Sequence, residues 1–157
     1  RRTMSVRLSE HFTLEELTAT QVRSMIELNR VVPAGVHHAL EQLCTTLLEP
    51  VREHFGRPVI IHSGYRCPEL NTLVGGSSTS QHRKGEAADF HVHGVPLVDV
   101  ARWLAASGLP FGQLILEGGR PGAWGWVHLS LGAPFREARR CGEVLTYDGT
   151  TYKRGLP

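Results

Sequence analysis

The segment from residue 80 to residue 89 holds the residues best suited to chemistry. It reads SQHRKGEAAD, in which Gly85 between His82 and Asp89 lets the backbone turn. An imidazole nitrogen and a carboxylate oxygen are both ordinary zinc ligands. A turn in this segment would bring the two side chains to one point. The spacing therefore predicts two ligands of a metal site, and a third must come from elsewhere in the chain.

Three other histidines compete for the third ligand position. His128 lies in the alternating run WVHLS at residues 126–130, on one face of a predicted strand. His91 and His93 follow Asp89 at alternate positions, so they are expected on the same face as that carboxylate. Spacing alone leaves the choice open between His128 and this pair.

The chain that positions these groups has the composition of one globular domain. Its 157 residues carry 17 Lys and Arg against 15 Asp and Glu, a net charge of +2, and 41% of them are hydrophobic. This composition supports a buried core and gives no general reason to expect nucleic acid or anionic lipid as a partner. The apolar runs are far shorter than the ~20 residues of a membrane span. Residues 1–12 lack the apolar stretch of a secretion signal, so we expect no signal peptide.

The first third of the chain is expected to be helical, over about residues 10–55. Thr13 and Glu16 form a capping box, which predicts the start of a short helix. From residue 34 to residue 55, apolar side chains recur every three or four positions, the period of an amphipathic helix. Pro50 should kink or split that helix, because proline cannot donate the backbone hydrogen bond.

The rest of the chain mixes strands with one helix. Elements are predicted as strands at 58–61, 87–92, 113–117 and 126–131, a helix at 98–106 and a terminal hairpin at about 143–153. Residues 62–85, rich in Gly, Ser, Thr and Asn, are predicted as a loop, whose length is uncommon unless it has a function. The irregular order favours an α+β fold with a mostly antiparallel sheet. We expect a single domain over residues 1–157, with its metal-site core at about 58–135.

Three ordered motifs resemble those of the M15 zinc peptidases, the D-Ala-D-Ala carboxypeptidase-like group that includes many phage cell-wall enzymes. They are SGYR at 63–66, SxHx6D at 80–89 and WVH at 126–128, and the opening FTLEE at 12–16 also looks like that subgroup. The resemblance implies a hedgehog/DD-peptidase-like fold, with helices flanking the sheet. It also implies one zinc ion per chain, held by His82, Asp89 and His128.

The resemblance assigns further roles around the metal, position by position. Three protein ligands leave a fourth position for water, which is typical of catalytic zinc and lowers the pKa of that water to ~7. Arg66 matches the arginine implied to hold the substrate or to stabilise the developing oxyanion. Ser80 matches a serine near the substrate backbone, and Trp126 is a candidate wall of the cleft.

The general base is the position at which the chain departs from the family pattern. Several members carry an acidic residue or a histidine two or three residues before the last zinc ligand, where this chain has Trp126 and Gly125. Glu117, at the end of a predicted strand, could deliver a carboxylate beside the metal instead. His91 and His93 remain alternatives, as the base or as groups that orient the ligands.

Two functions from different classes follow. The first is zinc-dependent hydrolysis of peptide bonds in peptidoglycan stem peptides, as a carboxypeptidase or endopeptidase, by metal-activated water. The resemblance further implies an endolysin or virion-associated enzyme, found on the phage particle or in the host cytoplasm before release, with phage virion or tail proteins as candidate partners. The second is a catalytically degenerate zinc-binding component, structural or adaptor, of a phage particle. The unassigned base keeps the second function open.

Overall fold

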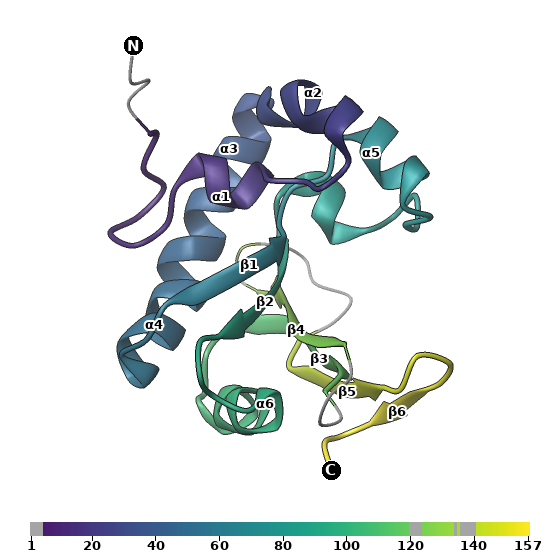
Figure 1. Cartoon of the computed structure of the whole chain (residues 1–157). Helices are drawn as coiled ribbons and strands as arrows, with labels where there is room; N and C mark the ends of the chain where they lie inside the picture. Colours follow the sequence, from purple (N-terminus) through teal and green to yellow (C-terminus); the bar gives the residue numbers. More distant parts are fainter. Residues whose placement is uncertain (1–4, 120–123, 134, 136–140) are drawn as a thin grey trace.

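A six-stranded sheet with the strand order β1-β2-β4-β3-β5-β6 forms the framework of the chain (Figure 1). The computed structural model describes residues 5–119, 124–133, 135 and 141–157. All neighbouring strands are antiparallel except β3 and β5, which run parallel. The strands are β1 Val59–Ser63, β2 Ala87–Val92, β3 Phe111–Gly118, β4 Gly125–Leu131, β5 Glu143–Tyr147 and β6 Tyr152–Arg154. The predicted α+β class and mostly antiparallel sheet are confirmed.

Helices precede the sheet and are inserted between its strands. They are α1 Leu14–Thr18, η1 Arg23–Met25, α2 Ile26–Arg30, α3 Ala34–Leu43, η2 Cys44–Leu48, α4 Glu49–Phe55, α5 Pro68–Leu73, η3 Gln81–Lys84 and α6 Leu97–Ala106. The Thr13 side chain caps α1, because its hydroxyl accepts a hydrogen bond from the backbone N–H of Glu16. Among the described residues, none of these helices combines the length and apolar character that a membrane span needs.

The long amphipathic helix is split at its proline, as predicted. The segment η2 is a π-helical turn between α3 and α4, and Pro50 lies in the first turn of α4. Proline cannot donate to the carbonyl one turn earlier, so the preceding turn widens. The hydroxyls of Thr45 and Thr46 donate to the carbonyls of Glu41 and Gln42 in this region.

The prediction of an uninterrupted loop over residues 62–85 was wrong. Two short helices, α5 and η3, lie within this segment. Pro68 occupies the first turn of α5, where its fixed φ favours a helix start and its missing N–H costs nothing. Both helices are too short to show an apolar period, which is why the composition of the segment indicated a loop.

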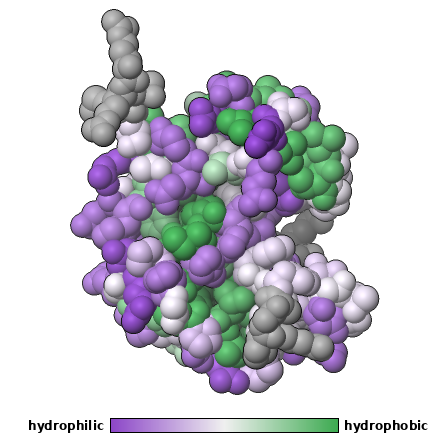
Figure 2. All heavy atoms as spheres, in the orientation of Figure 1, coloured by the Kyte–Doolittle hydropathy of each residue, from purple (hydrophilic) through white to green (hydrophobic). Residues whose placement is uncertain are grey.

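The two faces of the sheet have different environments. One face packs into the hydrophobic core with α3, α4 and α6, and contributes Phe90, Val127 and Leu129, all fully buried. Because side chains alternate along a strand, the residues between these point to the other face. Figure 2 shows the surface hollowed on the right, between the levels of α5 and of the β5–β6 hairpin in Figure 1. The open face of the sheet carries the candidate site.

Candidate metal centre

Three side chains from separate parts of the chain meet on the open face of the sheet. They are His82 from η3, Asp89 from β2 and His128 from β4, and one possible ligand atom of each lies within 4.8 Å of the others. Asp89 and His128 are direct partners in the β2–β4 register, so their side chains share a face. Strand pairing therefore positions two of the three groups, and the short helical turn of η3 brings the third.

Asp89 links the two imidazoles. Its Oδ1 lies 2.8 Å from Nδ1 of His128, and its Oδ2 lies 3.3 Å from Nε2 of His82. Burial would raise the pKa of Asp89, but the neighbouring His82 and the hydrogen bonds from both histidines outweigh it and hold that pKa well below its usual range. The carboxylate is therefore ionised at neutral pH, which is the form that binds a metal ion.

A backbone carbonyl fixes the orientation of the His82 ring. Nδ1 of His82 lies 2.8 Å from the carbonyl oxygen of Gly64, which can only accept, so Nδ1 carries the proton. Nε2 is then the ring nitrogen that lies on the side of Asp89, 3.3 Å from its Oδ2. The His82 side chain is buried, and such a contact to the second nitrogen is typical of metal-binding histidines.

The backbone that supplies this carbonyl is held by the first two helices. A Cβ on Gly64 would overlap the carbonyl oxygen of Leu17 in α1, so this close approach requires glycine. Next to it, the N–H of Tyr65 donates to the same Leu17 oxygen at 2.7 Å. The N-terminal helices thus determine where the carbonyl partner of His82 lies.

A buried asparagine completes the attachment. Nδ2 of Asn29 donates to the carbonyl oxygens of Thr18 (2.7 Å) and Tyr65 (2.9 Å), and its Oδ1 accepts from the N–H of Cys67 (2.8 Å). Asn29 is fully buried, and these bonds satisfy both ends of its amide. Asn29 was not predicted from the sequence, because one asparagine in a five-residue helix carries no distinguishing pattern.

Arg66 makes hydrogen bonds to two residues of η3 and its cap, Ser80 and His82. Its Nη2 donates to Oγ of Ser80 at 3.4 Å, and its backbone N–H donates to the carbonyl of His82 at 3.0 Å. Burial lowers the pKa of Arg66, and the nearby carboxylates of Asp89 and Glu117 oppose that shift. Its buried Nε finds no acceptor among the described residues. The guanidinium thus keeps donor capacity for an oxygen that enters the site.

Ser80 has a structural contact as well. Its Oγ accepts from the backbone N–H of His82 at 3.3 Å and caps η3. The same oxygen accepts the Arg66 guanidinium. The structure therefore shows Ser80 joining the helical turn of His82 to the arginine.

Glu117 and Trp126 form a hydrogen-bonded pair beside the three ligating groups. They are direct partners in the β3–β4 register, and Nε1 of Trp126 donates to Oε2 of Glu117. Burial and the charge of Asp89 raise the pKa of Glu117, and His128, the Trp126 hydrogen bond and His82 offset this only in part. A carboxyl group with a raised pKa near a metal site is typical of a general base.

The rival histidines lie outside the group of three. His91 is on β2, and its Nδ1 lies 2.6 Å from Nε2 of His62 on β1. Burial, His62 and His93 lower the pKa of His91. His93 is exposed and follows the end of β2 at Val92. His62 was not identified in the sequence, because its pairing depends on the β1–β2 register.

The donor set suits a divalent transition metal. Two imidazole nitrogens and one carboxylate oxygen are within the ligand preferences of zinc, and three protein ligands leave room for a further ligand. Asp89 is ionised, which is the form that binds a metal ion. The three side chains could therefore hold a metal ion once the imidazole nitrogens that face Asp89 are deprotonated.

The three side chains thus form a candidate metal centre on the open face of an α+β sheet. The Peptidase M15 family model matches residues 10–130, which is more than half of the chain, so the chain belongs to the M15 peptidases. The match begins before α1 and ends in β4, and so includes every group described above. It confirms the family resemblance of the sequence motifs. No curated protein matches the chain in sequence.

Proposed function

We propose that the chain is a zinc peptidase that hydrolyses peptide bonds in peptidoglycan stem peptides, as a carboxypeptidase or endopeptidase. The observation that carries the proposal is the meeting of His82, Asp89 and His128 on the open face of the sheet, in a chain of the M15 family. These three residues would hold the ion. Bound zinc supplies Lewis acidity toward the scissile carbonyl and a water of lowered pKa.

Glu117 is proposed as the general base. Its raised pKa makes it a stronger base than an ordinary glutamate, and the indole N–H of Trp126 fixes the orientation of one carboxylate oxygen. Glu117 would take the proton from the attacking water and deliver it to the leaving amine. The contact with Glu117 also gives Trp126 a positioning role besides that of a cleft wall.

Arg66 is proposed to hold the carbonyl oxygen of the scissile bond. As negative charge develops there, a guanidinium whose Nε has no acceptor among the described residues can donate to it. The hydroxyl of Ser80 bonds Nη2 of Arg66 and so restricts its rotation. We assign Ser80 to the substrate-binding region mainly through this contact.

The cellular setting rests on the resemblance alone. We propose action on the cell wall, from a phage virion or after release from the host cytoplasm, with virion or tail proteins as partners. The degenerate structural component remains the alternative outcome of the test below.

The test measures the zinc content of the purified protein and its hydrolysis of peptidoglycan. Mass spectrometry of the purified protein should find about one zinc per chain, and incubation with purified peptidoglycan should release new amino groups or D-Ala. Chelation should abolish the release, and added zinc should restore it. Asp89→Asn should lose the metal, whereas Asp99→Asn, an exposed carboxylate of α6, should keep it. Zinc without release on several wall chemistries would favour the structural component, and absence of metal would refute the ligand set.

A further inference from the structure

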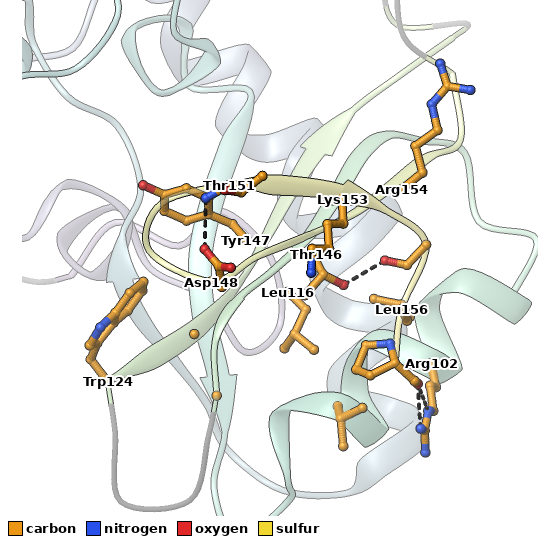
Figure 3. Close-up of a pocket in the computed structure, with 15 residues that line it drawn as sticks. Arg102, Leu116, Trp124, Thr146, Tyr147, Asp148, Thr151, Lys153, Arg154 and Leu156 are labelled. Carbon is orange, nitrogen blue, oxygen red and sulfur yellow. Dashed lines mark hydrogen bonds between the residues drawn. The ribbon is translucent and has the colours of Figure 1, made fainter.

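A cavity of about 880 Å³ lies on the face of the sheet opposite to the candidate metal centre, between the β5–β6 hairpin and α6. Figure 3 shows Leu116, Thr146 and Lys153 along its wall, and these residues are paired across β3, β5 and β6. Glu117 follows Leu116 on β3, so its side chain points to the other face. The sheet would separate a peptide in this cavity from the metal centre. The side chains that bind a peptide at the metal must therefore lie on the open face.

Two histidines, His62 and His91, meet on the open face beside the metal-binding side chains, and we call them the histidine pair. His91 follows Asp89 by two positions on β2, so both side chains point to the same face. Nδ1 of His91 lies 2.6 Å from Nε2 of His62, and the two ring centroids are 4.8 Å apart. His62 lies where the β1–β2 register shifts, between Ile61 and Ser63. Such a shift redirects a side chain and is common next to active sites.

The short distance inside the histidine pair determines what its outer nitrogens do. Two ring nitrogens at 2.6 Å require one hydrogen between them, so one ring donates and the other accepts. A neutral imidazole carries a single N–H. The ring that donates inside the pair is therefore an acceptor at its outer nitrogen, and the ring that accepts is a donor there. In either arrangement of the protons, the neutral pair offers one donor and one acceptor to a ligand.

The outer nitrogens are Nδ1 of His62 and Nε2 of His91. Neither has a hydrogen-bond partner within the part of the chain that the structure describes. His62 is exposed and His91 is half-buried. The contact is not needed to join β1 to β2, because the backbones of the two strands are already paired at Ile60 and His91. The histidine pair therefore has hydrogen-bonding capacity left for a ligand at the surface beside the centre.

The histidine pair and the proposed base lie on opposite sides of Trp126. The strand order places β1 and β2 on one side of β4, and β3 on the other. The ring centroid of His62 lies 6.1 Å from that of Trp126, whose Nε1 bonds Glu117. Two positions along β2 separate His91 from Asp89 by ~7 Å, which is about two residues of an extended peptide. A peptide that extends from the metal towards β1 would therefore bring a backbone group about two residues from the scissile bond to the pair.

The hydrogen-bonding pattern of the histidine pair matches a peptide backbone. Each peptide residue presents one N–H donor and one C=O acceptor. A free carboxylate can only accept and an ammonium can only donate, so either would leave one outer nitrogen without a partner. The pair therefore suits an amide of the peptide chain better than a charged end or side chain.

We propose that the histidine pair binds a backbone amide of the substrate peptide, by one donated and one accepted hydrogen bond, about two residues from the scissile bond. This inference rests on the proposed function and deepens it, because it assigns a subsite for the peptide backbone next to the metal centre. His62 and His91 are then substrate-binding residues, and the proton transfer is left to Glu117.

The first arm of the test measures the kinetics of the zinc-loaded protein on a soluble stem peptide at about pH 8, where an ordinary imidazole is neutral. His62→Phe keeps an aromatic ring without its nitrogens. It should raise KM roughly tenfold and leave kcat within about threefold, because the hydrogen bonds are made equally in the ground state and the transition state. His37→Phe, which replaces a histidine paired with Glu41 on α3, is the matched control and should change neither. An unchanged KM in His62→Phe, or a loss of kcat alone, would overturn the proposal.

The second arm replaces the backbone amides of the peptide one at a time by esters, which lack the N–H. One replacement, about two residues from the scissile bond, should raise KM about tenfold in the unmodified protein. The same replacement should have no further effect in His62→Phe, because the partner of that N–H is already gone. Equal effects in both proteins contradict the proposal. The series in the unmodified protein needs no variant, so absence of a sensitive position refutes the subsite even if His62→Phe does not fold.

Binding without hydrolysis separates this inference from the proposed function. A stem peptide whose scissile amide is replaced by CH₂–NH is titrated against the zinc-loaded protein by calorimetry, and its Kd should be about tenfold higher for His62→Phe. If the stem peptide is not cleaved, the proposed function fails and this titration alone decides the inference. Equal Kd values, or no binding to the unmodified protein, refute it. Zinc content and melting temperature show whether the variant is loaded and folded.

Discussion

Replacing Glu117 by glutamine tests the assignment of the general base most directly. The change keeps the shape of the side chain and an oxygen that accepts from Nε1 of Trp126, so the β3–β4 pair should remain in place. It removes only the capacity to take up a proton. Glu117 is outside the group of three metal-binding candidates, so the metal content should not change.

The size of the effect follows from the environment of the carboxylate. General base catalysis contributes about 10²–10⁴-fold, or ~3–5 kcal/mol of barrier. Burial and Asp89 raise the pKa of Glu117 above its ordinary 4.5. A base must be ionised, so kcat/KM should rise with pH as the Glu117 carboxyl loses its proton. This acidic limb should disappear in Glu117→Gln.

The assay is a pH profile of kcat/KM on a soluble stem peptide, with zinc content measured on each preparation. Glu53→Gln, an exposed carboxylate on α4, is the matched control and should leave the profile unchanged. A Glu117→Gln protein that keeps its zinc and retains activity within tenfold of the unmodified protein would refute the assignment. His91, which lies on the same strand as Asp89, would then be the next candidate.

Three other predictions concern the support of the site and the fold. In Gly64→Ala the added Cβ meets the Leu17 carbonyl and displaces the Gly64 carbonyl that accepts from His82. The change should lower the free energy of unfolding by about 2–4 kcal/mol, measured by urea unfolding. It should also weaken zinc affinity roughly 10–100-fold, measured by competition with a chelator. Arg66→Lys should lower kcat/KM roughly 100-fold with zinc retained, since a lysine replaces a fork of donors by one ammonium; an unchanged value would exclude the oxyanion role. Burial would raise the pKa of Glu49, but hydrogen bonds from Ser9 and His11 outweigh it and lower that pKa. The ionised Glu49 therefore stabilises the folded state at pH values above the ordinary 4.5, and this contribution is lost as pH falls through the lowered pKa. Glu49→Gln should therefore lose about 1–2 kcal/mol at neutral pH, and this deficit should vanish in acid when unfolding is followed at both pH values.

Local patterns predicted the elements that are long or regularly alternating. The strand alternation around His128 and the proline break at Pro50 were both visible in the sequence and both hold in the structure. The helix α5 was missed, because six residues give no period and its composition resembles a loop. The parallel pairing of β3 with β5 was also not predicted, since it depends on a long connection that carries no pairing signal.

At the site, motif order predicted which residues would meet, but not how they are supported. The convergence of His82, Asp89 and His128 followed from the resemblance, whereas spacing alone left His91 and His93 in competition. The choice between them depends on the β2–β4 register and on the position of η3, which are long-range properties. The contact of Trp126 with Glu117 likewise required the β3–β4 register.

The amide bridge of Asn29 has a consequence for engineering the enzyme. A fragment that starts at β1 would contain all three metal-binding candidates, Arg66 and Glu117. It would nevertheless lack Leu17 and Asn29, whose hydrogen bonds hold the backbone at Tyr65 and Cys67 beside the centre. It would also lack Thr18, whose carbonyl accepts from the Asn29 amide. Swapping the N-terminal helices for those of another protein would disturb the site in the same way, unless these three backbone contacts were transplanted with them. The helical segment is therefore a structural part of the candidate metal centre rather than an exchangeable accessory.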